Sequence, residues 1–178
     1  MSDLDTLAKT VDDAARNAKA IAQLSAGTKI SLDDAYAIQK KMIGLRISRG
    51  ERRVGMKMGF TSRAKMVQMG VSDMIWGRLT DKMLVEDGGR ISIAKYVHPR
   101  VEPEIAYLLK APLAGPVTPA QALAAVEAIA PAIEIIDSRF DNFKFSLEDV
   151  VADNASSTGF VVGPWSKPDI DCSNLGMI

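Results

Sequence analysis

Hydrophobic residues recur at three- and four-residue spacing near the N-terminus of this chain. This pattern predicts a first helix over residues 4–24 and a second helix that begins after Ser31 and ends at Gly50. Ser31 and Asp34 have the spacing of a capping box, in which each residue satisfies a backbone N–H of the other. We therefore expect residues 1–50 to form an N-terminal helical region.

The pattern changes after this region, because apolar and polar residues begin to alternate as they do in strands. Residues 51–178 are expected to form a β-rich region with a few short helices. A run of methionines that includes Met56, Met58 and Met74 is expected in the core, where Met fills irregular gaps. The predicted strands cover residues 52–58, 91–97, 101–109, 132–137 and 160–162. The predicted helices cover residues 62–70 and 118–130, the latter capped by Thr118, and one more helix is capped by Ser146.

Charge and composition exclude several classes of function. The 178 residues carry 22 Lys and Arg against 22 Asp and Glu, without a basic cluster, which argues against a nucleic-acid-binding protein. Apolar runs are shorter than a membrane span, and the acidic N-terminus does not resemble a signal peptide, so we expect a cytoplasmic protein that does not bind membranes. With one cysteine and one histidine, a metal site must use carboxylates, which favour Mg²⁺, Mn²⁺ or Ca²⁺.

Two glutamates one residue apart are the first candidates for such a site. Glu102 and Glu104 lie in an apolar stretch that reads as a strand, so their side chains point to the same face, roughly 7 Å apart. Glu134 stands alone among isoleucines, where an unpaired charge is costly to bury. A divalent cation would offset the repulsion between three converging carboxylates. The alternative is a solvated strand face, with Glu134 paired to an arginine, and spacing alone favours it.

Lys57 is the second candidate, because glycines flank it on its own face of a predicted strand. Gly55 and Gly59 leave a bare surface on which a ligand can approach closely. The ammonium group can bind a carboxylate there or transfer a proton. The alternative is an exposed lysine beside a bulge. Arg139 follows the Glu134 strand closely, so it is a candidate for binding substrate near the same site.

Four segments in order resemble one family of enzymes. They are Val54–Ser62, His98–Ala106, Ile133–Arg139 and Val151–Ser157. Together they make the whole chain similar to the hydratase/decarboxylase branch of the fumarylacetoacetate hydrolase superfamily. The resemblance implies an α+β fold, with N-terminal helices packed on a mixed β-roll or barrel. Because family members are longer at the C-terminus, it also implies that the barrel here is C-terminally incomplete.

The resemblance further assigns roles to individual residues. It implies an Mg²⁺ (or Mn²⁺) site with the ligands Glu102, Glu104 and Glu134. It implies catalytic roles for Lys57, Asp81 and Ser156, and it makes Lys57, Arg139 and Ser156 the candidate substrate-binding residues.

The expected substrate is a small 2-oxo dicarboxylate. The motifs favour metal-dependent decarboxylation of 2-oxo-3-hexenedioate in the meta-cleavage catabolism of aromatic compounds. Hydration of 2-oxopent-4-enoate at the same site is the first alternative, and a truncated, non-catalytic assembly partner is the second. A homo-oligomer is expected, as is a complex with the hydratase.

Overall fold

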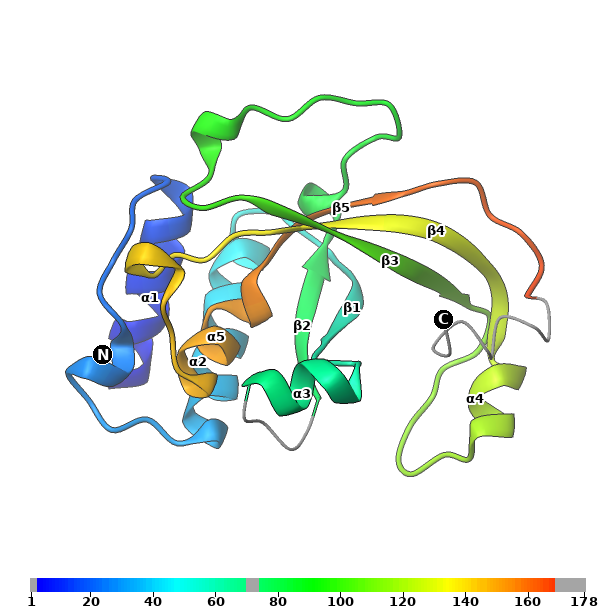
Figure 1. The fold of residues 1–178 in the computed structure, drawn as a ribbon, viewed down its shortest axis with the longest axis horizontal. Coiled ribbons are helices and arrows are strands. Elements are labelled where there is room, and N and C mark those ends of the chain that lie inside the picture. Colours follow the sequence, from blue (N-terminus) through cyan, green and yellow to red (C-terminus); the bar gives the residue numbers. More distant parts are fainter. Residues whose placement is uncertain (1–2, 70–73, 169–178) are drawn as a thin grey trace.

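The computed structural model describes residues 3–69 and 74–168. Within these residues the helices are α1 (Asp3–Arg16), α2 (Leu32–Ser48), α3 (Arg63–Met69), α4 (Pro119–Ala124) and α5 (Leu147–Ala152), and the strands are β1 (Arg53–Gly59), β2 (Ile75–Thr80), β3 (Arg100–Leu109), β4 (Val126–Ile136) and β5 (Ser157–Val162). Helices α1, α2 and α5 pack together at one end, and the long, curved sheet of β3, β4 and β5 extends away from them (Figure 1).

The helix starts follow the capping chemistry of the sequence. Ser31 accepts a hydrogen bond from the Asp34 backbone N–H and completes a capping box, which confirms the predicted start of α2. Thr118 and Ser146 cap α4 and α5 in the same way. These signals are local, because each needs only residues three positions apart.

The first helix is shorter than predicted. It ends at Arg16, and Ala18 has a left-handed φ of 48°, which a helix cannot continue through. Ile21 instead pairs with the loop after β4: its N–H donates to the Arg139 carbonyl at 2.8 Å, and its carbonyl accepts from Asp141 at 2.9 Å. This tertiary pairing removes residues 17–24 from the predicted helix.

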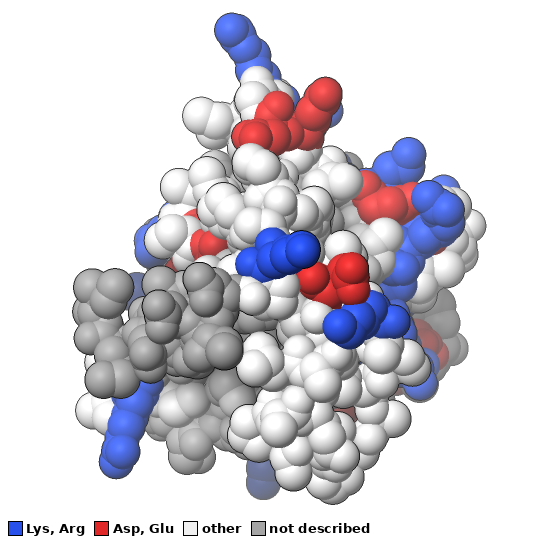
Figure 2. Space-filling view, turned by 90° about the vertical axis from the view of Figure 1, so that its right-hand side faces the viewer, with Lys and Arg blue, Asp and Glu red and all other residues white. Residues whose placement is uncertain are grey.

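The core lies where α1, α2 and α5 meet, and it also takes in residues from β2 and from the loop after β4. Val11, Ile38, Phe140 and Val151 are at most 1% exposed within it. Residues from the predicted helical and β-rich regions are thus packed in one cluster. The part of the chain that the structure describes contains no helix long and apolar enough to cross a membrane. Figure 2 shows acidic and basic side chains interspersed on one face, outside the grey atoms.

The strands form two antiparallel sheets, β1-β2 and β3-β4-β5. The described residues combine helices with strands, as an α+β fold requires. The named strands within residues 3–69 and 74–168 pair only antiparallel, so the expected mixture of parallel and antiparallel pairing is wrong for this part. The parallel contacts there are isolated bridges, such as Leu84 with Phe160.

Two predicted elements are replaced by others. The expected strand over residues 91–97 is an irregular segment with a 3₁₀ turn at Ile93–Lys95, where Ile93 is 72% exposed. The expected helix over residues 118–130 stops at Ala124, because the following residues join β4 and pair with β3 from Leu109 inward.

The methionine prediction is also wrong for three residues. Met56, Met58 and Met74 are 50%, 44% and 46% exposed. Alternation along β1 is as predicted, but the strand is turned so that Lys57 and its flanking glycines are the more buried side. The polar face of β1 therefore points into the molecule, which brings Lys57 toward β4.

Candidate metal centre

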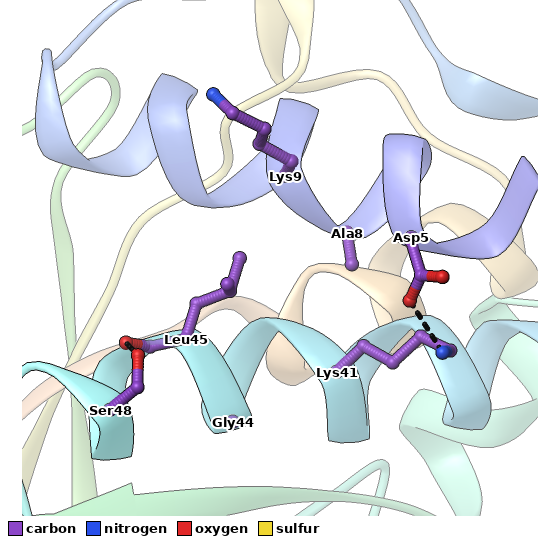
Figure 3. Close-up of a pocket in the computed structure, with 7 residues that line it drawn as sticks. All are labelled: Asp5, Ala8, Lys9, Lys41, Gly44, Leu45 and Ser48. Atoms are coloured by element: carbon purple, nitrogen blue, oxygen red, sulfur yellow. Dashed lines mark hydrogen bonds and ion pairs between the residues drawn. The ribbon is translucent and has the colours of Figure 1, made fainter. Parts of the chain in front are cut away.

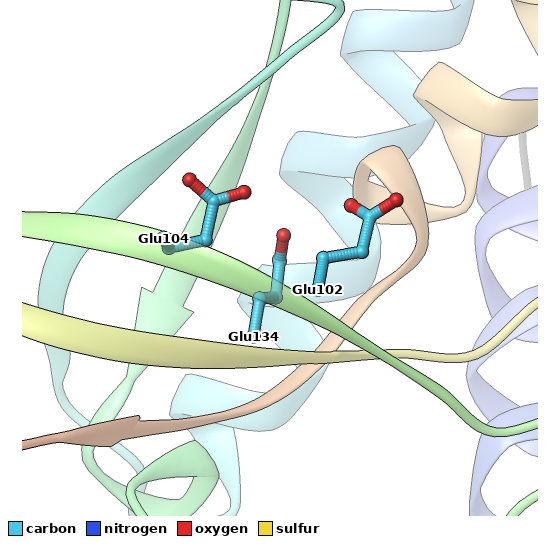
Figure 4. A group of neighbouring side chains, drawn as sticks. All are labelled: Glu102, Glu104 and Glu134. Carbon is cyan, nitrogen blue, oxygen red and sulfur yellow. The ribbon is translucent and has the colours of Figure 1, made fainter. Parts of the chain in front are cut away.

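Glu102, Glu104 and Glu134 converge on one side of the β3-β4 pair. Glu102 lies directly opposite Glu134 in the antiparallel register. One carboxylate oxygen from each of the three residues lies within 4.8 Å of the others. Figure 4 shows the three side chains projecting from the same side of the two strands. The predicted carboxylate cluster is therefore present in the fold.

Burial makes this cluster costly without a cation. Like charges directly opposite on neighbouring strands destabilise a sheet. Glu134 is only 4% exposed, and burial raises the pKa of its carboxyl group above the ordinary value of 4.5 even though Lys57 acts in the other direction. Its Oε1 atom is buried and has no hydrogen-bond partner among the residues that the structure describes. Since buried polar atoms are normally satisfied, this oxygen is positioned for a ligand.

Lys57 supplies the positive charge on the other side of Glu134. Its Nζ atom lies 3.1 Å from Glu134 Oε2, and the two side chains are 12% and 5% exposed. The contact joins β1 of the two-stranded sheet to β4 of the three-stranded sheet. The exposed lysine weighed from the sequence is therefore wrong, and so is the arginine partner for Glu134, which pairs with a lysine. The solvated face weighed for the other two glutamates is present in part, because Glu104 is exposed and Glu102 is partly exposed.

The donor set suits a hard divalent cation. Three carboxylates offer oxygen ligands, which Mg²⁺ and Ca²⁺ prefer. Glu134 is buried, Glu102 is partly exposed and Glu104 is exposed, so the cluster opens from the interior toward solvent. A cation held by these three residues would keep coordination positions on the open side for water or for the oxygens of a substrate.

Ser157 adjoins this cluster, although nothing in the sequence separated it from its neighbour Ser156. The Ser157 hydroxyl favours the ionised form of Glu134, although burial raises the pKa of this carboxyl group overall. Its Oγ atom is buried and has no hydrogen-bond partner within the described parts of the chain. Ser157 begins β5 and pairs with Ile136, two residues beyond Glu134 on β4. The two buried oxygens without partners in the described residues thus belong to neighbouring side chains.

Ser156 occupies a strained turn just before this strand. Asn154, Ala155 and Ser156 have φ values of 55°, 52° and 59°, a left-handed conformation that non-glycine residues rarely adopt. The turn packs against β2 at Gly77, where a Cβ atom would lie 2.4 Å from the Asn154 carbonyl oxygen. Such strain is found most often at functional sites. The catalytic role of Ser156 remains a prediction.

Arg139 lies in the interior, bound to Asp153. Its Nε atom donates to Asp153 Oδ1, its Nη2 to the Asp153 carbonyl at 2.7 Å, and its Nη1 to Thr158 Oγ1 at 2.6 Å. Burial raises the pKa of Asp153 to about 6, although the guanidinium favours the ionised form. These bonds fix the strained turn to the loop after β4. Substrate binding by Arg139 remains a prediction. In this structure its guanidinium group already donates hydrogen bonds to Asp153 and Thr158.

Asp81 follows β2 and holds the start of β1. Its carboxylate accepts a hydrogen bond from the Arg52 N–H at 2.9 Å and lies 3.2 Å from Arg52 Nε. The backbone hydrogen bond from Arg52 lowers the pKa of Asp81. These contacts connect the end of β2 to the start of β1, which gives Asp81 a structural role. Its catalytic role stays a prediction.

A groove of about 370 Å³ between α1 and α2 is a different kind of feature (Figure 3). Asp5 and Lys41 form an ion pair across it. Both side chains are about 40% exposed, so the pair lies in a solvated groove. The groove lacks the buried charge that marks the carboxylate cluster.

Comparisons with known proteins agree with the sequence motifs. The chain is 62% identical to a 4-oxalocrotonate decarboxylase of Pseudomonas sp. over 175 residues, which cover 98% of this chain and 68% of that protein. It is 42% identical to a 2-hydroxypent-2,4-dienoate hydratase of Pseudomonas putida, over 86% of this chain and 71% of the hydratase. No established family profile matches the chain.

Solved structures give the same relationship. The 4-oxalocrotonate decarboxylase from Pseudomonas putida G7, complexed with magnesium and adipate, superposes with a TM-score of 0.89 at 41% identity over 92% of this chain. Its complex with calcium and acetate gives a TM-score of 0.87 at 38% identity, also over 92% of this chain. The chain spans 64% and 63% of the lengths of these two structures.

Proposed function

Because the chain belongs to the 4-oxalocrotonate decarboxylase family, we propose that it takes part in metal-dependent decarboxylation of 2-oxo-3-hexenedioate, with 2-hydroxypenta-2,4-dienoate and CO₂ as products. The observation that carries this proposal is the convergence of three carboxylates at a buried oxygen to which no described residue hydrogen-bonds. The magnesium-bound and calcium-bound structures of a relative support a divalent cation here.

Glu102, Glu104 and Glu134 would hold Mg²⁺ or Mn²⁺. When bound, the cation supplies Lewis-acid stabilisation of negative charge on the substrate's C2 oxygen. Loss of the C6 carboxylate as CO₂ releases the electron pair of the C5–C6 bond. This pair forms the C4–C5 double bond, the former C3–C4 double bond becomes C2–C3, and the C2 carbonyl accepts the charge. Protonation of that oxygen completes the product.

We assign two roles to Lys57 in this reaction. Its ammonium group holds Glu134 from the side away from the unpartnered oxygen, which fixes the direction of the carboxylate. An ammonium group close to the cluster can also bind a substrate carboxylate or deliver a proton to the C2 oxygen. The first part follows from the contacts of Lys57, and the second is the role that the family resemblance implies.

Hydration is the second candidate, favoured by the relatives that carry hydratase names. The same carboxylate cluster serves both reactions, because each places a 2-oxo acid or its enol on a divalent cation. Groups around the distal carbon of the substrate must then decide between loss of CO₂ and addition of water. A homo-oligomer and a complex with the hydratase are further parts of the proposal, whereas a non-catalytic assembly role is the remaining alternative to it.

The test is an assay of the purified chain with 2-oxo-3-hexenedioate, in which CO₂ release and formation of the dienoate are both followed. We expect activity with Mg²⁺ or Mn²⁺ and loss of activity with EDTA. A parallel assay with 2-hydroxypenta-2,4-dienoate measures hydration. Full decarboxylation without divalent metal would contradict the proposal. Binding to the hydratase without turnover of either substrate would favour the assembly role.

A further inference from the structure

The two carboxylate oxygens of Glu134 have different surroundings. Oε2 lies 3.1 Å from the ammonium nitrogen of Lys57, whereas Oε1 is buried and has no hydrogen-bond partner within residues 3–69 and 74–168. The side chains of Lys57 and Glu134 are largely shielded from water, so water does not make the surroundings of the two oxygens alike. One oxygen is thus already bound, and the other remains for a ligand.

This asymmetry matters because carboxylates bind cations in two ways. Ca²⁺ takes six to eight oxygen ligands in flexible geometry and often accepts both oxygens of one carboxylate. Mg²⁺ demands a near-octahedral arrangement at short distances and keeps several waters. A carboxylate limited to one oxygen therefore suits Mg²⁺ better than Ca²⁺.

We propose that Lys57 is a positioning residue that limits Glu134 to one-oxygen ligation and thereby sets the preference of the site for Mg²⁺ over Ca²⁺. This rests on the proposed function, since it presumes that the glutamate cluster binds a divalent cation. Groups that hydrogen-bond to ligating side chains commonly fix their orientation and tune the metal site. Lys57 stands in that relation to Glu134.

The placement of Lys57 supports this role. Its strand belongs to the two-stranded sheet, so the ammonium group reaches Glu134 from outside the sheet that carries the glutamates. A Cβ atom on Gly59 would lie 3.8 Å from Lys57 Nζ, so the ammonium group lies directly alongside this glycine. Lys57 therefore approaches Oε2 from one direction, while β3 brings the other two carboxylates to the cluster.

A different arrangement makes a different prediction. If the ammonium group merely stood in for the cation and left when metal entered, its removal would strengthen binding of Mg²⁺ and Ca²⁺ alike. Removal of a positive charge near the site acts equally on two ions of equal charge. The ratio of the two dissociation constants therefore separates control of ligation from general repulsion.

The experiment measures Mg²⁺ and Ca²⁺ binding to the purified chain by calorimetry, for the wild type and for Lys57→Met. We expect the ratio of the two affinities to move toward Ca²⁺ by about tenfold or more, in the range that neighbours of metal ligands usually contribute. Lys57→Arg, which keeps a charged donor, should retain most of the wild-type ratio. If Lys57→Met does not fold, Lys57→Leu removes the donor to the same oxygen, and the same shift of the ratio is expected.

A double variant supplies the control. In Glu134→Gln the side chain offers only one carbonyl oxygen, so adding Lys57→Met to it should leave the ratio unchanged. A ratio that does not move in Lys57→Met, or moves equally in the Glu134→Gln background, would overturn the inference and leave the metal site in place. A wild-type chain that binds neither cation would overturn the proposed function and this inference together.

Discussion

Glu102 and Glu134 face each other across β3 and β4 as direct partners in the register, and each places a carboxylate on the same side of the sheet. Directly opposed like charges are unfavourable in a sheet, and here one member is buried. The register also brings Glu104 to the same point from two residues along β3. A single pairing thus creates both the electrostatic cost and the ligand set that a divalent cation needs.

Replacing one exposed glutamate of the cluster should weaken metal binding and catalysis together. Glu104→Gln removes one negative charge and leaves a weaker oxygen ligand, so we expect metal affinity to fall at least tenfold, about 1.4 kcal/mol. Calorimetry with Mg²⁺ and the CO₂ assay measure the two effects. Glu127→Gln is the matched control, because Glu127 is an exposed glutamate on β4 outside the cluster. Equal losses in both variants would show that charge alone matters.

Breaking the buried ion pair behind the site should destabilise the fold. Arg139 and Asp153 are 3% and 0% exposed, so Arg139→Met leaves a carboxylate buried without its partner. We expect a loss of about 3–5 kcal/mol in the free energy of unfolding at neutral pH. Urea denaturation measures it. Lys9→Met breaks an exposed pair with Asp13 and should cost at most about 1 kcal/mol. A similar small cost for Arg139→Met would contradict the assignment of the pair as structural.

Local signals account for the parts of the fold that were predicted correctly. The capping boxes at Ser31, Thr118 and Ser146 each depend on residues three positions apart, and all three are present. The shared face of Glu102 and Glu104 follows from strand alternation alone. These features need no knowledge of the partner strand, which is why sequence patterns reveal them.

Long-range pairing accounts for what could not be predicted. The sequence pattern does not predict strand β2, and it predicts helix over Val126–Ala130 because apolar, alanine-rich sequence suits both structures until a partner strand is present. The contact between Lys57 and Glu134 joins two separate sheets. The exposure of Met56 likewise depends on which face of β1 turns inward. No spacing rule along the chain contains this information.

Stability should depend on pH through Asp153. Burial raises its pKa from 3.8 to about 6, so the folded state holds the proton more tightly than the unfolded state. This contribution is fully present below pH 3.8 and is lost as pH rises through about 6. The free energy of unfolding should therefore fall by about 2–3 kcal/mol across this window relative to Asp153→Asn.

Chemical denaturation at a series of pH values from above 6 to below 3.8 measures the difference and also covers the range in which the control titrates. Asp13→Asn is the control with the opposite sign, because the hydrogen bond from Lys9 lowers the pKa of Asp13. Its contribution is present at higher pH and is lost on acidification. A difference between the wild type and Asp153→Asn that stays constant with pH would contradict the raised pKa.

Adjacent serines should separate positioning of the metal from catalysis. Ser157 has a buried hydroxyl beside Glu134, whereas Ser156 lies in the left-handed turn and carries the catalytic role implied by the family resemblance. Ser157→Ala removes a group that lowers the pKa of Glu134, so we expect Mg²⁺ affinity to fall by about tenfold, most strongly at acidic pH. Ser156→Ala should leave Mg²⁺ affinity unchanged and reduce turnover. Calorimetry and the CO₂ assay on both variants show which serine affects metal binding and which affects turnover. Reduced Mg²⁺ affinity in Ser156→Ala alone would reverse the roles given to the two serines.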